Sequence, residues 1–228
     1  MPHKHLPLSK RIDDLFVVYY LTLIAIIEGV AFILIIENLF PEPLRERILS
    51  ADPGVMEALR SHFHAVWPYA AMSMLIVVMT SFQYAVFLIS LRWKLRLSDT
   101  VLPFLFGLSQ AIQTFFFRKP EYWWLMFAVI CAVAIVTYLV NMTAKNQWEK
   151  GSNAYGLIRR TFLTSICMSA GAAALAVHVS KGLFYNTISV IESEQWLWGM
   201  LIVSLIFLGV NSSAGKQMMD IINAKHLE

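Results

Sequence analysis

Residues 15–36 read LFVVYYLTLIAIIEGVAFILII, a run in which Glu28 is the one charged side chain. A helix needs about 20 predominantly apolar residues to cross the hydrocarbon core of a bilayer. The run therefore predicts a transmembrane helix, and it places a carboxyl group near the middle of the membrane.

The rest of the chain repeats this pattern. Of its 228 residues, 58% are hydrophobic and 14% are charged, whereas soluble domains are about 45–50% apolar and about 25% charged. Further apolar runs lie at about 66–90, 101–117, 122–141, 161–179 and 196–211. We expect an all-α integral membrane protein, with about six transmembrane helices in a single domain over 1–228. The run at 101–117 is short, and the alternative is a re-entrant segment.

Basic residues in the connecting segments predict the orientation. Of the 18 lysines and arginines, twelve fall on the side of the two termini and six on the other. Basic residues are enriched in cytoplasmic loops, so we expect both termini in the cytoplasm, with the protein in a plasma membrane or a bacterial inner membrane. The net charge of +3 is small, and no nucleic acid partner is expected.

Two features are expected on the outer side. In the long segment 41–64, Asp52 followed by Pro53 is typical of a helix start, and the segment is predicted to form an amphipathic helix on the outer surface. Tryptophan prefers the membrane interface. Five tryptophans fall at outer ends of the runs: Trp67, Trp123, Trp124, Trp196 and Trp198.

Glu28 is the strongest candidate for function. A charged side chain at the bilayer centre costs on the order of 2.5–3.5 kcal/mol on insertion scales, and such residues often mark ion or proton pathways. The alternative is a protonated glutamate that hydrogen-bonds a second helix. Neutral partners are available: Gln110 and Gln113 share a helix face, and Gln83 and Tyr84 form a polar stripe in the run 66–90. These side chains either line a hydrated path or join helices.

Small residues recur at every fourth position of the run 161–179, as Ser165, Ser169 and Ala173. This spacing lets helices approach closely, either within the fold or between subunits, and it is the basis for expecting a homo-oligomer. Cys131 and Cys167 lie inside apolar runs, where they are expected to be packing residues.

No reaction can be read from the sequence. Glycine-rich phosphate loops, HExxH and CxxC motifs are absent, so we expect neither an enzyme nor a cofactor. His62 and His64 are two positions apart and do not face each other on a helix, so no metal site is expected.

Two functions remain open. The first is a channel or transporter for ions, protons or a small solute, with Glu28 in the pathway. The second is a non-transporting membrane subunit, such as a defence or immunity component. It would anchor, sense for or dock a soluble partner, and we expect a cytoplasmic protein to bind through 142–160 or the C-terminal stretch. A hydrated cavity at Glu28 would favour transport, and a dry contact with a glutamine would favour the subunit.

Overall fold

The computed structural model describes residues 8–50, 52–90, 98–143 and 153–226. Over these residues the secondary structure is entirely helical. The helices are α1 (Leu8–Leu39), α2 (Glu42–Leu49), α3 (Val55–Ser90), α4 (Ser98–Thr114), α5 (Pro120–Thr143), α6 (Asn153–Phe184) and α7 (Val190–His226).

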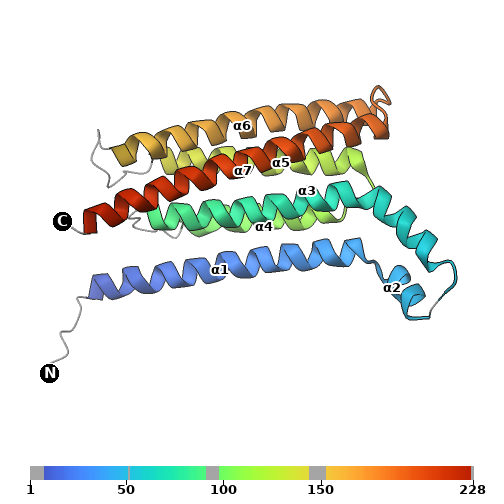
Figure 1. The fold of residues 1–228 in the computed structure, drawn as a ribbon, viewed down its shortest axis with the longest axis horizontal. Helices are drawn as coiled ribbons and strands as arrows, with labels where there is room; N and C mark the ends of the chain where they lie inside the picture. The colour runs from blue at the N-terminus through green and yellow to red at the C-terminus, as the bar shows by residue number, and fades with distance from the viewer. Residues whose placement is uncertain (1–7, 51, 91–97, 144–152, 227–228) are drawn as a thin grey trace.

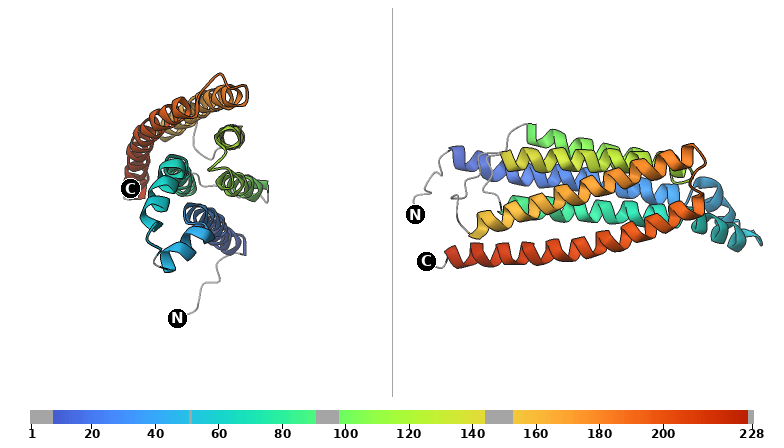
Figure 2. Two further views of the ribbon diagram at one scale, coloured as in Figure 1. Left: turned by 90° about the vertical axis from the view of Figure 1, so that its right-hand side faces the viewer. Right: turned by 90° about the horizontal axis from the view of Figure 1, so that it is seen from above.

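The helices other than α2 run side by side in one bundle (Figure 1). Viewed along the bundle, α3, α4 and α5 lie between α1 on one side and the α6–α7 pair on the other (Figure 2). The start of α1 and the end of α7 lie at the same end of the bundle. Two ends on the same side require an even number of crossings if every long helix spans the membrane.

Five of the described helices, α1, α3, α5, α6 and α7, are long and apolar enough to cross a membrane. The chain is therefore a multi-pass membrane protein. The sixth expected span corresponds to α4, which has 17 residues and a length of about 25 Å at 1.5 Å per residue. Its apolar part, Val101–Thr114, is shorter than the other spans. A sixth crossing stays a prediction, as does the side of the membrane on which the termini lie.

The expected outer segment 41–64 is helical but is not one separate helix. It contains α2, a turn, and the first part of α3, which continues without interruption to Ser90. Pro68 lies inside α3, where proline removes one backbone hydrogen bond and bends a helix. Figure 1 shows the first part of α3 and the whole of α2 projecting beyond the bundle. Placement of this segment on the outer membrane surface stays a prediction.

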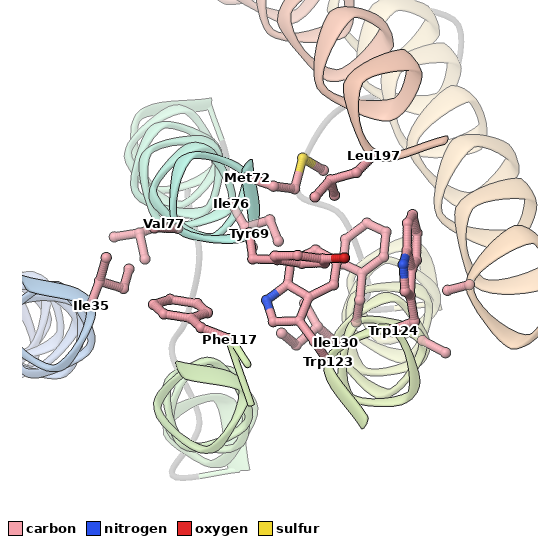
Figure 3. Close-up of a cluster of buried hydrophobic side chains, with 14 of the residues drawn as sticks. Ile35, Tyr69, Met72, Ile76, Val77, Phe117, Trp123, Trp124, Ile130 and Leu197 are labelled. Carbon is pink, nitrogen blue, oxygen red and sulfur yellow. The ribbon is translucent and has the colours of Figure 1, made fainter. Parts of the chain in front are cut away.

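The core of the bundle is aromatic at the end nearest to α2. Trp123 and Trp124 of α5 are 0% exposed, and Tyr69 of α3 is 1% exposed (Figure 3). Trp123 packs edge-on against Tyr69 at 5.2 Å and stacks on Phe127 at 5.5 Å between ring centroids.

The expectation that Trp123 and Trp124 face the lipid interface is therefore wrong, because large rings fill the space where α3, α5 and α7 converge. Trp67, Trp196 and Trp198 are 42%, 49% and 44% exposed, as an interfacial position requires.

Helices α6 and α7 form an outer layer of the bundle, and few of their residues are buried by other helices. In their spanning parts 22% and 17% of the residues are buried, against 50% in α3. The small residues of α6 are used within the chain: Ser165 is buried and lies beside Tyr138 of α5, and Ala173 packs against the core. The stripe therefore no longer supports an interface between subunits, and a homo-oligomer stays a prediction without that argument.

Candidate functional site

Glu28 lies in the contact between α1 and α3. The Ser81 hydroxyl of α3 donates a hydrogen bond to Glu28 Oε2. The same hydroxyl also lies 3.0 Å from the Val77 carbonyl oxygen. A serine hydroxyl has one proton, so it can donate to only one of these two acceptors at a time. Among the residues that the structure describes, the hydrogen-bond partner of Glu28 is Ser81 and not a glutamine.

Close packing of α4 against α1 occurs beside this carboxyl group. A Cβ atom added at Gly107 would lie 1.7 Å from Ile27 Cγ2, the side chain next to Glu28 in sequence. Only glycine allows α4 to approach α1 this closely, and the approach brings the polar face of α4 into the region between α1 and α3.

Gln110 and Gln113, the two glutamines of α4, both face α3. Gln110 Nε2 donates to Thr80 Oγ1 at 3.3 Å, and Thr80 is the neighbour of Ser81. The Ser73 hydroxyl donates to Gln113 Oε1 at 3.3 Å. The predicted common face of the two glutamines therefore binds one helix, at two levels of α3.

Two further bonds extend the polar region toward the end of the bundle near α2. Trp123 Nε1 of α5 donates to Ser73 Oγ at 3.3 Å. Asn38 Nδ2 of α1 donates to Thr114 Oγ1 of α4, also at 3.3 Å. We call the polar region between α1, α3 and α4 the polar layer; its members are Glu28, Asn38, Ser73, Thr80, Ser81, Gln110, Gln113 and Thr114. Along α1 it covers ten residue steps, or about 15 Å.

Three atoms of the polar layer are buried and have no hydrogen-bond partner among the described residues. They are Glu28 Oε1, Gln110 Oε1 and Gln113 Nε2. A buried polar atom left unpaired costs about 1–3 kcal/mol, and buried polar groups in proteins are generally paired with protein or with ordered water. The polar layer therefore offers both donors and acceptors to small polar molecules.

Gln83 lies in a different place from the polar layer. The Tyr138 hydroxyl of α5 donates to Gln83 Oε1, so these two residues join α3 to α5. The side chain of Tyr84 is outside the described residues, as are 144–152 and most side chains at the end of α7. The docking role expected for 142–160 and the C-terminal stretch thus stays a prediction.

A cavity of about 260 Å³ lies between α3, α5, α6 and α7. It is lined by Gln83, Tyr138, Thr80 and Ser169, together with many apolar side chains. Glu28, Gln110 and Gln113 are not among its lining residues. The Thr80 side chain is shared: it lines the cavity and accepts the bond from Gln110.

His62 makes a buried contact that the sequence analysis missed. Its side chain is 8% exposed. Nε2 donates to the Leu39 carbonyl oxygen at the end of α1 at 3.0 Å, and Arg118, after α4, donates to Nδ1 at 2.6 Å. The contact joins three segments that are distant in sequence, so no local pattern indicates it. Among the described residues no group of histidine, cysteine and acidic side chains could hold a metal ion.

Ser73 and Ser81 were not predicted as site residues, although their spacing in the sequence indicates a shared helix face. Ser73, Thr80 and Ser81 recur at spacings of seven and eight residues, which places them on one side of a helix. This stripe identifies the polar side of α3, but it does not identify the helix that the stripe faces.

Comparisons with protein-family models, with curated proteins and with solved structures found no match to this chain. The geometry of its own residues is therefore the basis for the functional proposal.

Proposed function

We propose that the protein transports protons, alone or coupled to a small cation or solute, and that Glu28 is the group that gains and loses the proton. The observation that carries this proposal is the set of three buried, unpaired polar atoms in the polar layer, on Glu28, Gln110 and Gln113. Water molecules are the smallest partners that pair with such atoms. A hydrated row of hydroxyl, amide and carboxyl groups is a route along which protons can move.

The Ser81 hydroxyl can donate to Glu28 Oε2 or to the Val77 carbonyl oxygen. This choice of acceptor allows Glu28 to gain and lose a proton. When Glu28 is ionised, the Ser81 hydroxyl donates to its carboxylate. When Glu28 is protonated, its own O–H donates to Ser81 Oγ, and the Ser81 proton turns to the Val77 carbonyl oxygen. Both states keep every proton of the pair in a hydrogen bond. The carboxyl group can therefore change charge while α1 and α3 stay in contact.

The test is proton flux into liposomes that contain the purified protein and an internal pH-sensitive dye. Wild-type protein is expected to conduct, and Glu28→Gln is expected to reduce the flux by about tenfold or more, equivalent to an increase in the barrier of at least about 1.4 kcal/mol. Glu37→Gln is the matched control, because Glu37 is an exposed carboxyl group on the same helix. It should conduct like the wild type.

A non-transporting membrane subunit is the second candidate. It is favoured by the bonds of Glu28, Asn38, Gln110 and Gln113, each of which joins two helices. In this case neither wild-type protein nor Glu28→Gln carries protons or other ions, and Glu28→Gln changes only the stability of the α1–α3 contact. That result would overturn the transport proposal.

A further inference from the structure

The cavity between α3, α5, α6 and α7 is long and mostly apolar. Along α3 it is lined from Met72 to Gln83, eleven residue steps or about 16 Å. Apolar side chains of α3, α5, α6 and α7 line it, and Phe106 of α4 contributes as well. They include Ile76 and Met79, Phe127 and Ile130, Met168, and Met200 and Phe207. An apolar cavity of about 150 Å³ is enough to bind benzene. A volume of 260 Å³ with this length fits one hydrocarbon chain and is too small for a whole lipid.

Two polar side chains, Gln83 and Tyr138, line one end of the cavity. Gln83 is the lining residue of α3 nearest to the end of the bundle where α1 starts, and Tyr138 of α5 donates to its Oε1 atom. The amide nitrogen of Gln83 is not used in that bond and can donate to a carbonyl oxygen. At the other end the cavity is lined by Met72 of α3 and Phe127 of α5, and the buried ring of Trp123 stacks on Phe127.

One side of the cavity faces the surroundings of the bundle. Helices α6 and α7 diverge from their short connection near 185–189 toward the opposite end of the bundle (Figures 1 and 2). The lining residues on these two helices include Cys167 and Gly171, which are exposed, and Val203, which is 41% exposed. Both helices are apolar enough to cross a membrane, so the surroundings of this opening are the hydrocarbon interior of the bilayer.

We propose that this cavity binds one acyl chain of a bilayer phospholipid. The chain enters between α6 and α7 from the leaflet at the end of the bundle where α1 starts. Its ester carbonyl oxygen accepts a hydrogen bond from Gln83 Nε2, and its hydrocarbon tail lies along Met79, Ile76 and Met72 toward the aromatic core. This site shares Thr80 with the polar layer, but it does not depend on the transport proposal.

The test is photolabelling in vesicles of phosphatidylcholine and phosphatidylglycerol. A small fraction of the phosphatidylcholine carries a diazirine in the middle of one acyl chain, and mass spectrometry locates the label after illumination. Ile130 and Cys131 line the cavity and are 2% and 6% exposed, so bulk lipid does not reach them. We expect label on these two residues in the wild-type protein.

Two glycine variants supply the matched comparison. Gly171 lines the cavity and Gly199 does not, and an added Cβ atom meets nothing within 4 Å at either position. Gly171→Leu should fill the opening and abolish the label at Ile130 and Cys131, whereas Gly199→Leu should leave it unchanged. Wild-type label confined to lipid-facing residues such as Ile202 and Ile206, or equal label in the two variants, would overturn the proposal.

Discussion

Gly107 sets the distance between α1 and α4, because a Cβ atom there would overlap Ile27 Cγ2 at 1.7 Å. The neighbouring Glu28 and the α4 residue Gln110 belong to the polar layer. Gly107 therefore sets how closely α4 approaches α1 beside the polar layer.

Gly107→Ala should destabilise the folded protein by about 1–3 kcal/mol, as overpacking of a well-filled contact does. The measurement is the free energy of unfolding in mixed micelles titrated with a denaturing detergent. Gly209→Ala is the control, because an added Cβ atom meets nothing within 4 Å there. It should stabilise α7 by about 0.5–1 kcal/mol, the helix preference of alanine over glycine. Ile27→Ala should rescue Gly107→Ala; failure of that rescue would show that the overlap with Ile27 is not the cause.

His62 should make the stability of the protein depend on pH. Its Nδ1 atom accepts a hydrogen bond from Arg118 and its Nε2 atom donates to the Leu39 carbonyl, so the folded protein requires the neutral ring. Protonation puts a second positive charge against the guanidinium group. A free histidine changes charge near pH 6.5, and stability should therefore fall as the pH is lowered from about 7.5 to about 5.5.

The readout for His62 is the midpoint of thermal unfolding at each pH. His62→Gln keeps one donor and one acceptor, and it should flatten the decrease between the two pH values. His64→Gln is the control, because His64 is exposed, and it should keep the wild-type profile. An unchanged profile in His62→Gln would contradict the prediction.

At the scale of the element, the turn between α2 and α3 is held by Asp52. The backbone N–H of Gly54 donates to Asp52 Oδ1 at 2.9 Å, and Arg47 Nε donates to Oδ2 at 2.7 Å. These bonds, that of Gly54 first, hold the pKa of the Asp52 carboxyl group below its usual value. The bonds stabilise the turn above the pKa of an unfolded aspartate, and this stabilisation is lost as the pH falls through the lower, folded value.

Arg47→Gln should raise the pKa of Asp52 toward the ordinary value, without restoring it fully, because the Gly54 bond remains. The measurement is an NMR titration of the Asp52 carboxyl carbon in selectively labelled protein. Arg45→Gln is the control, because it removes another exposed arginine of α2, and it should leave the titration midpoint unchanged. A midpoint that moves equally in both variants would indicate general charge loss instead of the bond to Arg47.

Some features of the helices can be predicted from the sequence, and others cannot. A run of apolar residues such as 15–36 predicts a membrane helix because the bilayer requires about 20 of them. The structure confirms that the regular secondary structure of the described residues is helical, with five helices long and apolar enough to cross a membrane. The apolar pattern does not predict that α3 begins at Val55 and continues as one helix to Ser90. His62 and His64 interrupt the apolar pattern without interrupting the helix, since a helix bonds its own backbone whatever side chains it carries.

The polar layer was predictable only in part, for a related reason. Glu28 is conspicuous because a charge in an apolar run is costly. Its partner Ser81 is not conspicuous in the sequence, because serine is common where membrane helices pack together. The direction in which Gln110 or Gln113 points depends on how α4 is rotated against α1 and α3. That rotation follows from contacts such as Gly107 with Ile27, which join residues 80 positions apart in sequence.

In the bundle as a whole, the number of membrane crossings depends on α4. The start of α1 and the end of α7 lie at the same end of the bundle, which requires an even number of crossings. The five long apolar helices provide an odd number, so α4 must supply the sixth crossing if each of the five crosses once. Its length of about 25 Å at 1.5 Å per residue is slightly less than the ~30 Å hydrocarbon core. Inside the bundle, Gln110 donates a hydrogen bond to Thr80 of α3 and Thr114 accepts one from Asn38 of α1, so part of its polar surface is paired with neighbouring helices.

Six membrane crossings predict which single cysteines are accessible from outside the cell, once Cys131 and Cys167 have been replaced by alanine. Lys119→Cys, in the turn between α4 and α5, and Lys181→Cys, near the end of α6, should both react with a membrane-impermeant maleimide added to intact cells. Lys216→Cys, on α7, should react only after the cells are permeabilised. All three lysines are exposed in the folded chain, so a difference in reactivity reports the side of the membrane and not burial. The comparison that tests α4 is between Lys119→Cys and Arg45→Cys on α2, another exposed position, because only α3 and α4 separate Arg45 from Lys119. If Arg45→Cys and Lys119→Cys report opposite sides of the membrane, α4 does not cross. The polar layer would then be open to one side only, and protons could not pass through it from one side of the membrane to the other.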